Sequence, residues 1–239
     1  QSFPKKNDSL YTGSCVVSNG GNDIAAEANI PGSIALIDSV GNTASFQAQI
    51  MQTSDPIDAN KPFITAFIIP ANAVYKAGDT LDFIFRFNEK IVLTSTITAS
   101  TLSLTIGTKT KSAVYSGGSL TDSLLFRYII QPGDSDKDGI STGSSITLNS
   151  ADIKDIAGNN ASLSFNAPSS TKNIIIDGIA PTVGSVIVPA PAIYKTGNIL
   201  DFLVTYTKKI IVPIADGTPF LTISIGNTLK NAMSTSGPG

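Results

Sequence analysis

Histidine is absent from this sequence, and cysteine occurs only once, at Cys15. Histidine is the commonest general base and metal-binding side chain, so its absence excludes histidine-dependent triads and histidine metal sites. A single cysteine excludes an intrachain disulfide and a thiolate zinc cluster. Because Cys15 begins the apolar run Cys-Val-Val, we expect it to be a small core residue. Together these absences indicate that the chain is not an enzyme.

Charge and long hydrophobic runs are also scarce. Charged residues make up 14% of the 239 residues, and the formal net charge is −2. Without a basic excess, the chain lacks the electrostatic attraction on which nucleic-acid binders depend. No apolar run approaches the roughly 20 residues that a transmembrane helix needs. The sequence starts at Gln1 without a signal segment, so we expect a processed mature form or a piece of a longer protein.

The residue types that are abundant favour strands and turns. Val, Ile, Leu and Phe occur among many Thr, Ser, Gly and Asn residues, a mixture typical of β-structure. Every odd position in residues 81–87 is large and apolar, and residues 101–106 alternate in the same way, which indicates strands with one face on a core. Residues 124–130 and 173–176 are denser apolar runs that predict central strands. The sequence therefore predicts an all-β protein.

An internal repeat organises the chain. When Pro62 is aligned with Pro181, the residues that follow match without a gap at a spacing of 119 residues, and about a third of the pairs are identical. Residues 33–42 resemble residues 150–159 more loosely. We therefore predict three parts, which are the back part of one repeat in residues 1–61, a complete repeat in residues 62–180, and the front part of a further repeat in residues 181–239.

The repeated motifs resemble those of one family. The run Pro-Ala-x-Ala-x-Tyr-Lys-x-Gly-x-x-Leu-Asp-Phe, then Leu-x-Leu-x-Ile-Gly, Gly-Asp-x-Asp-x-Asp-Gly-Ile and Asp-x-x-Gly-Asn, is similar to the bacterial immunoglobulin-like (cadherin-like) repeats of large surface adhesins and biofilm proteins. The resemblance is strongest over residues 62–228 and implies tandem immunoglobulin-like β-sandwich repeats in a secreted, rod-like array on the bacterial cell surface. About seven strands per repeat agrees with that fold. One departure is that Lys208 replaces Glu89 in the third part.

A calcium site is predicted in residues 134–140. Asp134, Asp136 and Asp138 alternate before a glycine, as in the first half of an EF-hand loop, and the Ile140 backbone carbonyl would add a fourth oxygen. The twelfth position of such a loop is a serine, which supplies no bidentate carboxylate, so a residue such as Asp155 or its neighbour Asp152 would have to complete the shell. The alternative is an acidic, solvated turn without an ion.

The junctions between repeats contain a second candidate calcium site. Asp58 and Asp177 each precede the proline that starts the next repeat, loosely like the acidic linkers that hold calcium in cadherin-like arrays. An ion there would stiffen the rod by joining neighbouring repeats. The alternative is a turn whose proline merely begins the next strand, since each linker carries only one carboxylate.

We therefore expect a structural spacer, or stalk, in an extracellular bacterial adhesin or surface fibre, with calcium as the stiffening ion. One alternative is a filament protomer that assembles head-to-tail, with the half-repeat at one end of a copy completed by the half-repeat of the next. Another is an adhesion module that binds a host or matrix glycan or protein through loops, although the absence of Trp weakens a sugar-stacking site. Neighbouring repeats or further copies of the chain are the expected partners.

Overall fold

The computed structural model describes residues 5–7, 10–11, 13–50, 57–93, 99–168, 170–211 and 218–235. These residues form strands and turns without an α-helix, so no helix among them is long and apolar enough to cross a membrane. The prediction of an all-β chain is confirmed. The chain divides into two compact units, residues 1–177 and residues 178–239.

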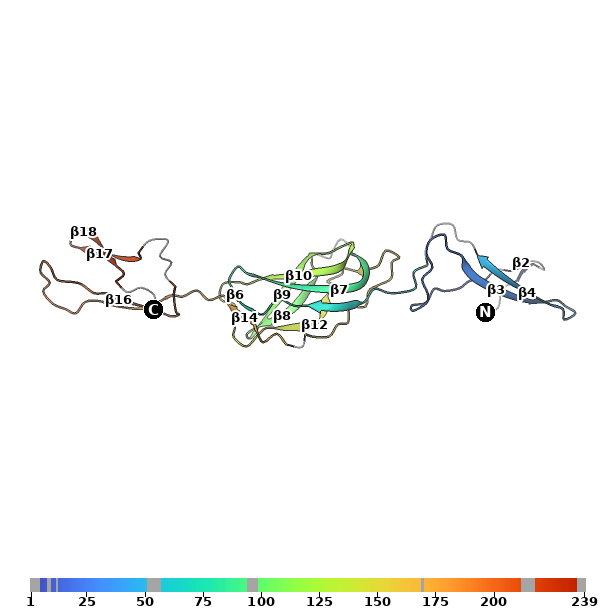
Figure 1. The fold of residues 1–239 in the computed structure, drawn as a ribbon, viewed down its shortest axis with the longest axis horizontal. Helices are drawn as coiled ribbons and strands as arrows, with labels where there is room; N and C mark the ends of the chain where they lie inside the picture. The colour runs from blue at the N-terminus through green and yellow to red at the C-terminus, as the bar shows by residue number, and fades with distance from the viewer. Residues whose placement is uncertain are drawn as a thin grey trace. The chain divides into compact units, whose positions relative to one another are not determined.

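The larger part of the first unit is residues 62–177, which we call the central sandwich. Its larger sheet has the strand order β12-β8-β9-β10-β7-β13, with β5 also paired to β7, and its smaller sheet has the order β11-β14-β6. This arrangement is consistent with a β-sandwich (Figure 1). The two apolar runs expected to be central are interior strands, namely β10 in the larger sheet and β14 in the smaller one. The strand bounds are β5 Ile64–Ile68, β6 Ala73–Lys76, β7 Thr80–Leu93, β8 Thr101–Ile106, β9 Lys109–Gly117, β10 Thr121–Ile129, β11 Ser135–Asp136, β12 Ser141–Thr147, β13 Ile153–Lys154 and β14 Ile174–Asp177.

Strand β7 forms the centre of the core. Its odd residues from Leu81 to Phe87 are buried, as their alternation with polar residues predicts. The ring of Phe85 stacks on Phe67 at 4.5 Å and meets Phe126 and Phe165 edge-on at 5.7 and 4.8 Å. Four aromatic rings from separate segments therefore pack together in the middle of the sandwich.

Strand β7 also joins the two ends of the central sandwich. At the downstream end, Lys76 precedes the turn into β7 and is the Cα partner of Asp177. At the upstream end, the β7 residue Asn88 donates its backbone N–H to the carbonyl of Phe63, at 3.1 Å. The stretch of β7 from Thr80 to this point is about 26 Å long at the usual rise per strand residue. The chain thus reaches the sandwich at one end and leaves it at the other.

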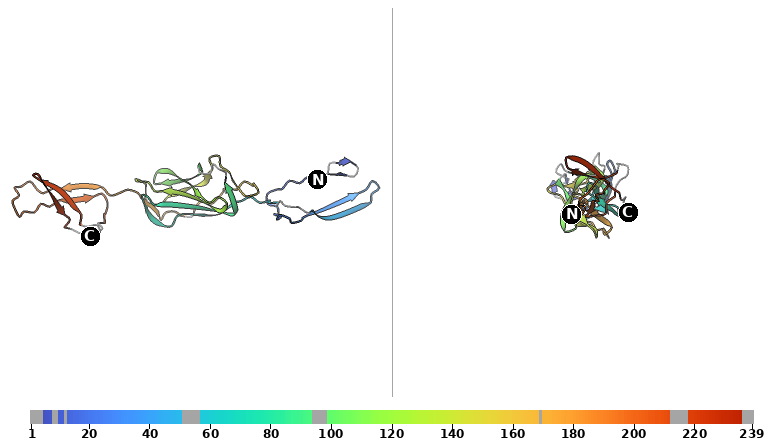
Figure 2. Two further views of the ribbon diagram at one scale, coloured as in Figure 1. Left: turned by 90° about the horizontal axis from the view of Figure 1, so that it is seen from above. Right: turned by 90° about the vertical axis from the view of Figure 1, so that its left-hand side faces the viewer.

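The described residues before the central sandwich form two hairpins, in which β1 (Lys5–Asn7) pairs with β2 (Leu10–Tyr11) and β3 (Ile30–Ile37) pairs with β4 (Thr43–Ile50). Figure 2 shows β3 and β4 as a long blue pair of arrows. The expectation that Cys15 is a core residue is wrong, because Cys15 is a free, exposed cysteine. It lies in a segment without strand pairing, and its neighbours Val16 and Val17 are also exposed, so no sheet covers this apolar run.

The second unit contains two hairpins, in which β15 (Val183–Ile187) pairs with β16 (Leu203–Tyr206) and β17 (Phe220–Ile225) pairs with β18 (Thr228–Met233). Their registers recur from the central sandwich at a spacing of 119 residues. The pair Val183↔Tyr206 corresponds to Ile64↔Phe87, and the pair Ile225↔Thr228 corresponds to Ile106↔Lys109. The turn between β6 and β7 recurs too, because Gly78 and Gly197 have positive φ angles of 92° and 90°, which glycine adopts without strain.

Candidate metal centre

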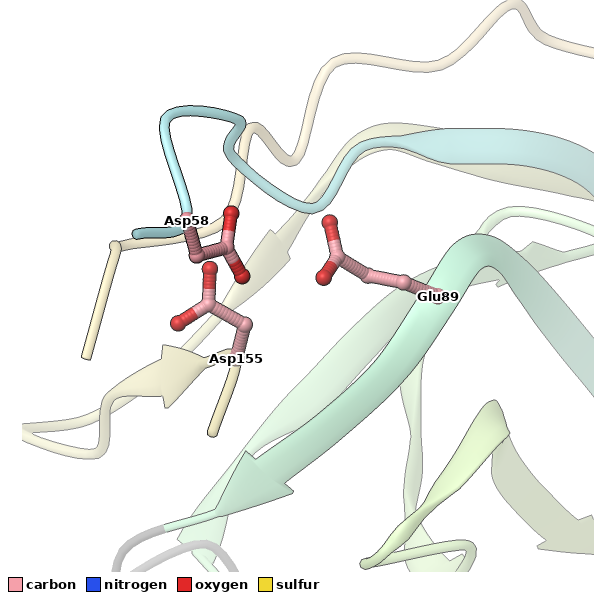
Figure 3. Close-up of side chains that lie close together, drawn as sticks. All are labelled: Asp58, Glu89 and Asp155. Carbon is pink, nitrogen blue, oxygen red and sulfur yellow. The ribbon is translucent and has the colours of Figure 1, made fainter. Parts of the chain in front are cut away.

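Three carboxylates converge at the upstream end of the central sandwich. One oxygen each from Asp58, Glu89 and Asp155 lies within 4.8 Å of the other two. Figure 3 shows the three side chains pointing toward one another from three separate segments. Asp58 belongs to the linker before β5, Glu89 lies in β7, and Asp155 directly follows β13. Residues that are 31 and 66 positions apart in the sequence therefore meet at one point.

A tight turn holds Asp155 in place. The backbone N–H and the side-chain amide of Asn159 donate to the two Asp155 carboxylate oxygens, both at 2.8 Å. The Asp155 N–H in turn donates to the carbonyl of Asn159, at 3.1 Å. The positive φ of 98° at Gly158 lets the chain close this turn. The Asp-x-x-Gly-Asn motif thus forms a turn that fixes the orientation of the Asp155 carboxylate.

The linker that carries Asp58 is held from two sides. The side-chain amide of Asn159 also donates to the backbone carbonyls of Asp58 and Asn60, at 3.3 and 3.1 Å. From the other side, the Asp23 carboxylate accepts the N–H of Ala59 at 2.9 Å and the side-chain amide of Asn60 at 2.8 Å. The linker is therefore pinned between the preceding segment and the central sandwich, with Asp58 facing Glu89 and Asp155.

The three carboxylates of the cluster repel one another. Burial raises the pKa of the Glu89 carboxyl above its usual value, and the negative charges of Asp58, Asp155 and Asp23 raise it further, while a hydrogen bond from the Asn88 amide opposes the shift. Like charges at this separation repel strongly in a partly desolvated site. A cation between the three carboxylates would replace that repulsion with attraction.

The repulsion predicts a pH-dependent effect of Glu89→Gln in a chelating buffer. Because the folded pKa of Glu89 is raised, its contribution to stability is complete below its usual value of 4.5 and is lost as the pH rises through the folded pKa. At neutral pH the variant should therefore be more stable than the wild type. The difference should vanish at acidic pH. Urea unfolding at both pH values measures it, and a variant that is less stable at neutral pH would contradict the repulsion.

In the predicted calcium loop, residues 134–140, the carboxylates of Asp134 and Asp136 bind other groups of the protein. The Asp134 carboxylate is buried and accepts hydrogen bonds from Tyr128 and from the Gln131 backbone, at 2.5 and 2.9 Å, and it pairs with Lys111 Nζ at 2.7 Å. Burial alone raises the pKa of Asp134, but the hydrogen bonds from Lys111, Tyr128 and Gln131 outweigh it and hold the pKa below the usual value. Asp134 already has the partners that an anion needs within the protein.

The other loop residues also bind protein groups. One oxygen of Asp136 accepts the N–H of Gly107 at 2.7 Å, and the other accepts that of Gly139 at 2.8 Å. The carbonyl of Ile140 accepts a hydrogen bond from the Thr171 hydroxyl. Within the described ranges, Asp134, Asp136 and Asp138 do not converge as the upstream carboxylates do. The geometry here is that of a structural turn that fixes the loop, and calcium binding by it stays a prediction.

The remaining candidate ligands, Asp58, Asp155 and Asp177, do not all lie at the same end of the central sandwich. Asp155 lies with Asp58 and Glu89, whereas Asp177 lies beside Ser135 of β11 at the downstream end. Sequence reasoning named Asp58 and Asp155 but assigned them to different sites, and it did not name Glu89 as a candidate. One signal was available in the sequence. Residues next to Glu89 recur 119 positions later, but Glu89 itself is replaced there by Lys208.

No protein-family model, curated protein or solved structure matches this chain. Its function is therefore inferred from its own residues.

Proposed function

We propose that this chain is a structural spacer, built from tandem immunoglobulin-like repeats of about 119 residues, in an extracellular bacterial adhesin or surface fibre. The recurrence of strand registers and turns at a spacing of 119 residues supports the repeat. A spacer needs each repeat to hold its shape and each junction to resist bending. The aromatic core holds the shape of the repeat, and the upstream carboxylates are the groups that resist bending at the junction.

One observation carries the proposed role of the junction, namely that the linker residue Asp58 meets Glu89 and Asp155 of the central sandwich. A cation held by all three would tie the linker to β7 and to the turn after β13 of the repeat that it enters. Oxygen-only ligands with several carboxylates are typical of calcium, which accepts irregular geometry and additional carbonyl or water oxygens. Magnesium requires a stricter octahedron and keeps more of its water. We therefore propose calcium as the ion.

Calcium is expected to raise the melting temperature of the wild-type chain relative to a chelating buffer. At a free calcium concentration one hundred times the dissociation constant, binding stabilises the folded state by about 2.7 kcal/mol. Glu89→Gln should remove most of this increment, because it deletes one ligand while leaving the hydrogen bonds of Asp155 to Asn159 intact. Thermal unfolding of both chains in calcium and in chelator measures the effect.

Asp138→Asn is the matched control, since it removes one carboxylate from the predicted loop and none from the upstream cluster. The control should keep the full calcium increment. If Asp138→Asn loses the increment and Glu89→Gln keeps it, the loop binds the ion and the junction does not. If calcium stabilises none of the chains, the ion has no part in the spacer.

A further inference from the structure

The chain enters the central sandwich and the second unit through the same reciprocal pair of hydrogen bonds, which we call the entry pair. In the central sandwich, the N–H of Phe63 donates to the side-chain oxygen of Asn88 at 2.7 Å, and the N–H of Asn88 donates to the carbonyl of Phe63 at 3.1 Å. Thr182 and Thr207 take these places in the second unit, at a spacing of 119 residues. The N–H of Thr182 donates to the Thr207 hydroxyl oxygen at 3.0 Å, and the N–H of Thr207 donates to the Thr182 carbonyl at 2.9 Å. The positions next to the entry pair are therefore structurally equivalent in the two repeats.

The residue after the entry pair has opposite charge in the two repeats. It is Glu89 in the central sandwich and Lys208 in the second unit. Both side chains are half-buried, whereas the lysines that follow them, Lys90 and Lys209, are exposed. The local backbone therefore holds the first of these residues against the repeat and leaves the next one in solvent. A change of charge at the first position acts inside the repeat, and not on its surface.

Lys208 holds the segment through which the chain enters the second unit. Its ammonium group donates a hydrogen bond to the backbone carbonyl of Ile179 at 2.6 Å. Ile179 lies three residues before Thr182 and is the counterpart of the linker residue Asn60. A hydrogen bond from an ionised donor is roughly twice as strong as one between neutral groups. The lysine therefore ties the entering segment to the residues that follow β16.

A different group holds the same linker position in the central sandwich. There the carbonyl of Asn60 accepts the side-chain amide of Asn159 at 3.1 Å, and the linker residue Asp58 faces Glu89 and Asp155 (Figure 3). With a glutamate after the entry pair, any cation that joins the linker to this position has to come from solution. With a lysine there, the positive charge is part of the chain.

We propose that Lys208 is the built-in cation of the second unit, and that the residue at this position decides whether the entry to a repeat depends on calcium. Glu89 makes the entry to the central sandwich respond to the ion, and Lys208 makes the entry to the second unit independent of it. The part that concerns Glu89 rests on the calcium site proposed above, whereas the role of Lys208 does not. In a spacer with both kinds of entry, loss of calcium loosens one and leaves the other held.

Amide hydrogen exchange of the full chain in a chelating buffer tests the role of Lys208. Exchange at the amides of Thr182 and Thr207 reports how often the entry pair opens. Lys208→Met keeps most of the side-chain length but removes the donor, so exchange at these two amides should become about tenfold faster, the lower end of the range for a hydrogen bond to a charged group. Lys208→Arg should restore the wild-type rates, because a guanidinium group also donates to carbonyls. Lys209→Met, at the exposed neighbour, is the control and should leave both rates unchanged.

Three results would overturn this role of Lys208. They are no acceleration in Lys208→Met, equal acceleration in Lys209→Met, and unrestored rates in Lys208→Arg. In the last case the lysine would act through its shape and not through its charge.

Glu89→Lys tests the same idea in the central sandwich. In chelator, the new ammonium group would stand beside the Asp58 and Asp155 carboxylates, so the variant should melt at a higher temperature than the wild type. It should also melt above Glu89→Gln, which removes repulsion without adding a cation. Added calcium should change its melting temperature little, because the cluster already holds a positive charge. A melting temperature in chelator at or below that of Glu89→Gln would show that a lysine does not replace the ion.

Hydrogen exchange in the wild type separates failure of this inference from failure of the calcium site. Removal of calcium should accelerate exchange at Phe63 and Asn88 and leave Thr182 and Thr207 unchanged. If it accelerates neither pair, the proposed calcium site is wrong, and the comparisons made in chelator still decide the role of Lys208. If it accelerates both pairs equally, the second unit also depends on the ion, and the inference is wrong.

Discussion

Asp134→Ala is expected to lower the free energy of unfolding by about 3 kcal/mol, which is the lower end of the range for breaking a buried ion pair. The substitution leaves the Tyr128 hydroxyl and the Gln131 N–H without their acceptor. The loss stays near the lower end because the Lys111 side chain is 25% exposed and can turn toward water. Urea unfolding of the wild type and the variant measures the difference.

The pH dependence and a matched variant separate this ion pair from a calcium site. Since the folded pKa of Asp134 is lowered, its contribution is present above its usual value of 3.8 and is lost as the pH falls through the folded pKa. The deficit of Asp134→Ala should therefore shrink in acid and should be equal in calcium and in chelator. Lys111→Met, which keeps the carboxylate and its other two donors, should cost less. A deficit that appears only in calcium would show that Asp134 binds the ion instead.

The sequence predicted the turn in this loop but not the protein groups that its carboxylates contact. The Gly-Asp-x-Asp-x-Asp-Gly spacing correctly indicated a turn, and Gly139 has the positive φ of 103° that such a turn requires. The partner of Asp134 is Lys111 of β9, which is distant in the sequence and close only because β9 and β10 pair. Spacing within one segment carries no information about such a partner. An alternation of carboxylates therefore does not show which internal cation and backbone donors the fold brings to it.

The same limit explains why the sequence did not predict the cluster of Asp58, Glu89 and Asp155 at the junction. Alternation predicted the strand of residues 81–87, and Asp155 belongs to one of the repeated motifs, Asp-x-x-Gly-Asn. Nothing in either pattern shows that β13 pairs with the later part of β7, which brings Asp155 toward Glu89. Strand order is a property of the whole sheet. The repeat predicts boundaries for the parts, but only the sheet topology shows which carboxylates meet.

Phe85→Ala is expected to have the largest effect, a loss of about 3–5 kcal/mol of folding free energy. Phe85 is fully buried, its Cα partners are Phe67 of β5 and Leu124 of β10, and its ring touches three others. Truncation leaves a cavity among rings on separate segments that cannot all move inward together. Denaturant unfolding measures the loss. Phe63→Ala, at a half-exposed residue of the same sandwich, is the control and should cost far less.

The cavity should also weaken the junction, because Phe165 packs on Phe85 and Phe67 and lies six residues after Asn159. Residues 163–168 are outside the described strands, so ring packing is a main restraint on that segment. Phe85→Ala should therefore speed amide hydrogen exchange in residues 159–168 and lower the calcium increment, while Phe63→Ala should leave both nearly unchanged. Unaltered exchange in that segment would mean that the Asp155 turn keeps its position without the core. The junction would then depend on the Asp155 turn itself and not on the core of the central sandwich.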